Sequence, residues 1–147
     1  MQNPLLELQE YENLAEALKK GRGPLQVTGT LDSQKVHLMY ELGQELPADG
    51  LRFPWKLVVT YDDTRAKEIY DDFRNFTKNV MLYPAKDLLF YSADIHGNLM
   101  TRQRISVLRH LMEDEGGVVV TTMDGLMDHL LPLKYMRDQI VTVMEGQ

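Results

Sequence analysis

The chain has 147 residues, a length typical of one domain, and its 44% apolar and 26% charged residues give a globular rather than a disordered composition. It contains no cysteine, which excludes a disulfide framework, a cysteine zinc site and a thiol nucleophile. The formal net charge of −6 argues against autonomous nucleic-acid binding, because a domain that holds DNA by itself usually carries a basic face.

The N-terminal part of the sequence is expected to form two helices joined by a short strand. Apolar residues at helical spacing predict the first helix over residues 4–20, which ends at Gly21. Residues 25–28 are a short apolar run before a glycine turn, which is typical of a strand. The second helix is expected over residues 34–46 and ends before Pro47, because proline disfavours helical geometry in the preceding residue. Its inward face is expected to consist of Leu38, Met39, Leu42 and Leu46.

The middle of the chain is expected to form a strand, a helix and a second strand. Residues 56–61 are almost continuously apolar, as in a parallel strand that is covered on both faces. Asp62 and Asp63 follow as candidate helix caps, and residues 64–76 carry apolar side chains at helical spacing. Residues 80–83 are expected to be a short strand. The inward face of the helix is expected to contain Ala66, Ile69, Tyr70, Phe73 and Phe76.

The C-terminal part begins with residues 85–100, which show no clear period, and continues with a helix expected over residues 101–115. A strand over residues 118–121 and a short helix over residues 123–131 follow. Residues 140–143 are expected to be the last strand, and we expect the chain to be part of a longer protein because it stops directly after that strand. The inward face of the long helix is expected to contain Ile105, Leu108, Leu111 and Met112.

This alternation of helices and strands predicts the fold class. Strands of parallel character separated by helices indicate an α/β fold with an open, mainly parallel sheet, helices on both faces and right-handed crossovers. The sequence contains no internal repeat and no low-complexity segment.

The turn before the second helix carries a partial phosphate-binding motif. Residues 29–36 read GTLDSQKV, against the P-loop pattern G-x-x-x-x-G-K-[ST]. Gln34 replaces the second glycine, and Val36 replaces the hydroxyl that binds Mg²⁺. No acidic strand end nearby could serve as a Walker B carboxylate. We therefore expect a degenerate, P-loop-like turn that binds no cofactor, although an ordinary strand, turn and helix can show the same spacing. It consists of Gly29, Asp32, Ser33, Gln34, Lys35 and Val36.

Three arginines of the helix over residues 101–115 are candidate contacts for an anion or a partner: Arg102, Arg104 and Arg109. Arg102 and Arg109 lie seven residues apart and therefore on one helical face. The alternative is a solvated face with local ion pairs. The four histidines are scattered and form no H-E-x-x-H motif, so we expect no metal site and assign no catalytic residue.

An ordered series of segments resembles the N-terminal UvrB-like region, domain 1A, of the bacterial transcription-repair coupling factors, the Mfd family. After the degenerate phosphate loop come KLVVTYDDTRAKEIYDDF (56–73), LYPAKDLL (82–89), RQRISVL (102–108) and GVVVTTMDGLM (117–127), closed by Leu131-Pro132. The resemblance covers about residues 20–147. UvrB itself has an intact P-loop and a tyrosine-rich hairpin after the strand that corresponds to residues 80–83, and this chain has neither.

The resemblance implies a parent protein that hydrolyses ATP, translocates on DNA, displaces stalled RNA polymerase and recruits UvrA in nucleotide excision repair. Residues 1–22 would be an N-terminal helix, residues 23–143 an incomplete UvrB-like domain, and residues 144–147 the start of the next domain. This part would have no enzymatic activity, cofactor or metal, because Mg-ATP would serve the motor of the parent.

The same resemblance implies that the partners are other domains of the same protein in the bacterial cytoplasm. UvrA, RNA polymerase and double-stranded DNA would be reached through the parent, with little autonomous DNA binding and no membrane contact. Two alternatives stay open. One is a functional nucleotide-binding domain of the UvrB or helicase type, and the other is a generic α/β protein-interaction domain.

Overall fold

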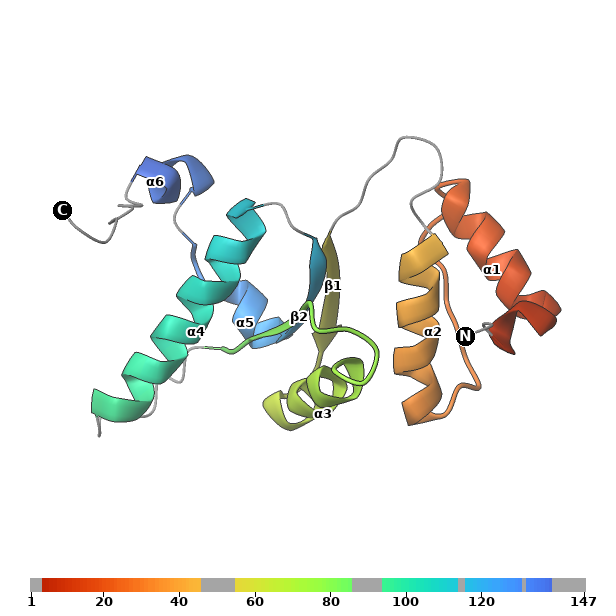
Figure 1. The fold of residues 1–147 in the computed structure, drawn as a ribbon, viewed down its shortest axis with the longest axis horizontal. Helices are drawn as coiled ribbons and strands as arrows, with labels where there is room; N and C mark the ends of the chain where they lie inside the picture. Colours follow the sequence, from red (N-terminus) through yellow and green to blue (C-terminus); the bar gives the residue numbers. More distant parts are fainter. Residues whose placement is uncertain (1–3, 46–54, 86–93, 114–115, 131, 139–147) are drawn as a thin grey trace.

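The computed structural model describes residues 4–45, 55–85, 94–113, 116–130 and 132–138 (Figure 1). Its elements are a 3₁₀ helix η1 (Pro4–Glu7), α1 (Gln9–Lys19), α2 (Asp32–Glu45), β1 (Trp55–Thr60), α3 (Asp63–Phe73), β2 (Val80–Tyr83), α4 (Asp94–Glu113), β3 (Gly117–Thr122), α5 (Met123–Met127) and α6 (Leu133–Asp138). Among these residues, no helix combines the length and apolar character that crossing a lipid bilayer requires.

The sheet has three parallel strands in the order β1-β3-β2. The last strand in the chain therefore lies in the middle, with Val58 paired to Val120 on one side and Leu82 paired to Val120 on the other. Because β3 is covered on both faces, its sequence is apolar at successive positions rather than alternating. The prediction of an α/β fold with a mainly parallel, open sheet is confirmed.

One face of the sheet is covered by α3, and α2 packs against α3 and adds Val36 to the same core cluster. Val118 and Val120 of β3 point to this side and pack against Phe73 of α3 and Val36 of α2. The predicted inward positions Ala66, Ile69 and Phe73 are confirmed as buried, and Tyr70 is partly buried against the same cluster. Phe76 lies beyond the end of α3 and is 38% exposed, so its predicted inward position is wrong. On α2 the predicted inward position of Met39 is confirmed, whereas Val36 and Tyr40, which complete the core side, were not predicted. The predicted position Leu46 lies outside the described residues.

The opposite face of the sheet is covered by α4. Successive side chains of a strand point to opposite faces, so Val119 meets Val107 of α4 on this side. Leu108 and Leu111 pack there as predicted, whereas Ile105 is 59% exposed and its predicted inward position is wrong. Helices on both faces of the sheet are thereby confirmed.

The strand predicted over residues 25–28 is not formed. This segment is exposed throughout, and in the described part of the chain only β1, β2 and β3 make up the sheet. A short apolar run gains strand structure only by pairing with a neighbouring strand, and no described strand lies beside this one. The phosphate-loop-like turn consequently joins an irregular segment, rather than a strand, to α2.

The bounds of two other helices also differ from the prediction. The helix predicted from residue 101 begins at Asp94, and it includes Gly97, since a single glycine is tolerated inside a helix. The helix predicted over residues 123–131 ends at Met127, since Asp128 has extended backbone angles. Helix α6 was not predicted. The strand predicted over residues 140–143 and the domain start at residues 144–147 lie outside the described residues.

Candidate functional site

The turn that leads into α2 is shaped by local hydrogen bonds. Gly29 has a φ of +81°, a left-handed conformation that side chains other than glycine adopt with strain. The side-chain oxygen Oε1 of Gln34 accepts a hydrogen bond from the backbone N–H of Leu31 at 3.2 Å. This is the reaching-back half of a capping box, in which a Glu or Gln in the first turn satisfies a backbone donor. Gln34 thus stabilises the helix start at the position where a P-loop has its second glycine.

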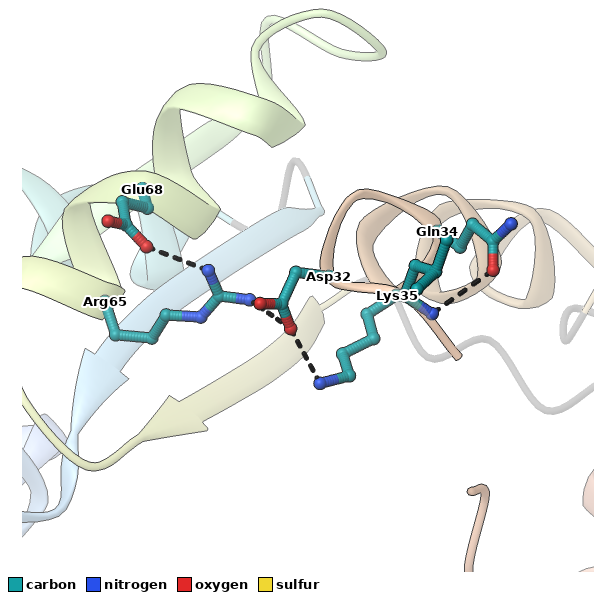
Figure 2. A network of polar contacts seen from close by, with 6 residues as sticks. Asp32, Gln34, Lys35, Arg65 and Glu68 are labelled. Atoms are coloured by element: carbon teal, nitrogen blue, oxygen red, sulfur yellow. Dashed lines mark hydrogen bonds and ion pairs between the residues drawn. The ribbon is translucent and has the colours of Figure 1, made fainter. Parts of the chain in front are cut away.

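The carboxylate of Asp32 is shared by two basic side chains from different helices (Figure 2). Its Oδ1 accepts a hydrogen bond from Lys35 Nζ at 2.8 Å and forms an ion pair with Arg65 Nη2 at 3.2 Å. Arg65 belongs to α3, and its Nη1 donates to Glu68 Oε2 at 2.8 Å. The four side chains carry two positive and two negative charges, so the cluster is neutral overall.

These contacts shift the pKa values of Asp32 and Arg65. The hydrogen bond from Lys35, assisted by the charge of Arg65, lowers the pKa of Asp32 below its usual value of 3.8. The hydrogen bond to Glu68 raises the pKa of Arg65; burial opposes that shift, and the charge of Asp32 supports it. Asp32 is therefore negatively charged and Arg65 positively charged at neutral pH.

Val36 occupies the position at which a P-loop offers a hydroxyl to magnesium. Its side chain is 1% exposed and packs in the core between α2, α3 and the sheet. Ser33 belongs to the first turn of α2. Val36 supplies no oxygen ligand, and a serine or threonine at position 36 would place a hydroxyl in an apolar core, which costs free energy unless it is hydrogen-bonded.

Arg104, one of the three candidate contact arginines, lies inside the protein. It is 6% exposed, and its Nη1 donates to the carbonyl oxygen of Pro84 at 2.7 Å and pairs with Asp128 Oδ2 at 2.8 Å. Its guanidinium also lies 4.3 Å from the centre of the Tyr83 ring. Burial raises the pKa of the Tyr83 phenol, an effect that the nearby positive charge of Arg104 opposes. Arg104 therefore joins α4 to the end of β2 and to Asp128, and it does not face an outside partner.

The other two arginines are on the surface. Arg102 is exposed, and Arg109 makes an ion pair with Glu113 one helical turn later, with 2.7 Å between Nε and Oε1. The alternative of a solvated face with local ion pairs fits Arg109. The structure therefore does not bring the three arginines together. A helical wheel that includes Val107, Leu108 and Leu111 places Arg104 on the inward side, and that signal was present in the sequence.

Arg65 and Glu68 are the members of the Asp32 cluster that sequence reasoning missed. Nothing in the sequence places Arg65 beside Asp32, because the packing of α2 against α3 decides that contact. In the part of the chain that the structure describes, no group of three or more histidines and carboxylates is arranged to hold a metal ion. Comparisons with protein-family models, curated proteins and solved structures found no match to this chain.

Proposed function

We propose that this chain is a non-catalytic scaffold domain from the N-terminal region of a bacterial transcription-repair coupling factor. The ordered series of segments described above supports the proposal, and a parallel α/β sheet with helices on both faces is compatible with it. The parent would be an ATP-driven DNA translocase of the cytoplasm that displaces stalled RNA polymerase and recruits UvrA. The activity would belong to other parts of that protein.

The assignment as a non-catalytic domain is supported by the side chains of the phosphate-loop-like turn. Lys35, which would bind the β- and γ-phosphates in an active P-loop, donates its hydrogen bond to Asp32 of the same turn. The position of the magnesium-binding hydroxyl is a buried valine, and the second glycine is a capping glutamine. A triphosphate would have to displace the carboxylate of Asp32, and position 36 would offer no oxygen ligand for its metal ion.

The scaffold assignment is supported by apolar side chains that the described fold leaves exposed. β1 is an edge strand, and its Leu57 and Val59 point to the face that α4 covers over the other strands. Leu57 is 58% exposed and Val59 39% exposed. In a domain that packs against other domains of a longer chain, such side chains would be covered.

Thermal unfolding with and without millimolar Mg-ATP tests the non-catalytic assignment. Binding at a concentration 100 times the Kd would stabilise the fold by about 2.7 kcal/mol, a Tm shift of roughly 5–10 °C for about 150 residues. We expect no shift. A clear shift that disappears in Lys35→Ala but persists in Lys67→Ala, which removes another exposed, ion-paired lysine, would overturn the proposal in favour of a nucleotide-binding domain.

The scaffold role is tested in the full-length parent with Leu57→Glu. In the isolated chain this substitution changes an exposed side chain, so we expect its Tm to change little. In the parent we expect faster cleavage of this domain by a protease and weaker repair of transcribed strands. The exposed charge change Asp63→Ala serves as the control. Unchanged cleavage and repair in the Leu57→Glu parent would contradict a packing role for this face.

A further inference from the structure

The cluster at the start of α2 has the composition of an oxyanion site that is already filled. Lys35 Nζ and Arg65 Nη2 approach the same oxygen atom, Asp32 Oδ1, at 2.8 and 3.2 Å (Figure 2). An ammonium and a guanidinium that converge on one oxygen are the donors with which proteins hold phosphate groups. The two donors come from different helices, so their convergence does not arise from local spacing along one helix.

The guanidinium of Arg65 is oriented by Glu68 of the same helix. Glu68 engages its Nη1 at 2.8 Å, which leaves Nη2 directed at Asp32. The Arg65 side chain is only 17% exposed, whereas that of Lys35 is 50% exposed and that of Asp32 68% exposed. The site is therefore open to solvent on the side of Lys35 and Asp32, where an external anion could approach.

We propose that Lys35 and Arg65 form a binding site for phosphate-type oxyanions, and that the carboxylate of Asp32 occupies this site within the chain. The carboxylate excludes an external phosphate and at the same time ties α2 to α3. Removal of that single carboxylate changes the charge of the cluster from neutral to +1 and frees both donors. The inference deepens the proposed function, since it identifies what blocks the phosphate-loop-like turn.

The test compares Asp32→Ala with the unchanged chain and with Asp63→Ala. Asp32 and Asp63 are each the first residue of a helix, and both are exposed, so the two substitutions alter net charge and helix starts in the same way. Inorganic phosphate and pyrophosphate are titrated at constant ionic strength, and the side-chain NMR signals of Arg65 and Lys35 are followed. A preserved amide spectrum and a retained cooperative unfolding transition establish that each variant is folded.

We expect saturable shifts at Arg65 and Lys35 in Asp32→Ala, with pyrophosphate bound at least tenfold more tightly than by the unchanged chain or by Asp63→Ala. Loss of the Arg65 shift in Asp32→Ala combined with Lys35→Ala would support the assignment. Equal binding by Asp32→Ala and Asp63→Ala would overturn it, because a general charge effect would then explain the result. That failure would leave the expected result of the Mg-ATP experiment on the unchanged chain unaffected, so the two proposals fail separately.

Discussion

Replacement of Arg104 by methionine should destabilise the domain more than any other arginine substitution on α4. Methionine keeps the length and apolar stem of the side chain but leaves the carbonyl oxygen of Pro84 without its charged donor and Asp128 without its ion-pair partner. Loss of a hydrogen bond to a charged group costs about 1.5–3 kcal/mol. Loss of the guanidinium over the Tyr83 ring adds roughly 0.5–1 kcal/mol.

The expected total is about 2–4 kcal/mol, because the Asp128 side chain is 24% exposed but the Oδ2 atom that pairs with Arg104 is itself buried and would lose this partner. For a domain of this size, each kcal/mol lowers the Tm by roughly 2–4 °C. Urea unfolding followed by circular dichroism measures the change directly. Arg109→Met is the matched control, since Arg109 is exposed and should change stability by less than about 0.5 kcal/mol.

A double-mutant cycle with Asp128→Asn isolates the ion pair from the other contacts of Arg104. We expect the two substitutions to be coupled by roughly 0.5–3 kcal/mol, as for residues in one network. The reasoning would be refuted if Arg104→Met destabilised the protein no more than Arg109→Met, since Arg104 would then not hold α4 to the sheet edge.

Two further predictions concern the hydrophobic core and the stability of the protein at acidic pH. Phe73→Ala should cost about 3–5 kcal/mol in urea unfolding, because Phe73 is 1% exposed at the centre of the cluster between α3 and the sheet; a loss below about 1 kcal/mol would contradict that packing. The contribution of Asp32 to stability should depend on pH. Its folded pKa is lower than its unfolded value, so the contribution is complete at neutral pH, begins to decline near the ordinary pKa and is lost as the pH falls through the lowered one. The difference in urea midpoint between the unchanged chain and Asp32→Ala should therefore be constant above about pH 5 and vanish in stronger acid. A difference that persists there would mean that Asp32 does not act through its charge.

The sequence alone was sufficient for elements whose signal is local. Helix α3 was predicted to within three residues, because the side chain of Asp62 caps it and Ala66, Ile69 and Phe73 recur at helical spacing. The prediction of Asp62 as a cap is confirmed by its hydrogen bond from the backbone N–H of Arg65 at 2.7 Å. Apolar runs likewise predicted β2 and β3 as strands, and the alternation of strands with helices predicted the parallel sheet. The expectation that residues 56–61 are covered on both faces is wrong, because β1 is an edge strand whose Leu57 is 58% exposed.

The candidate site was predicted in part. Gly29, Gln34, Lys35 and Val36 could be set against the P-loop pattern from sequence spacing alone. The contact between Asp32 and Arg65 could not be predicted, because 33 positions separate the two residues and only the packing of α2 on α3 brings them together. Arg104 was misplaced for a related reason, since its charge suggested a surface position although its spacing from Val107 and Leu108 is that of an inward residue.

The sequence by itself determined where helices and strands form in most of the described chain, because capping, helical spacing and apolar runs act between residues that are close along the chain. Only the tertiary structure decided the strand order, the burial of Arg104, the neutral cluster at Asp32 and the absence of a strand at residues 25–28. A strand needs a hydrogen-bonded neighbour, and a buried charge needs a partner. Both are supplied by residues that are distant in the sequence, so neither could be predicted from local pattern.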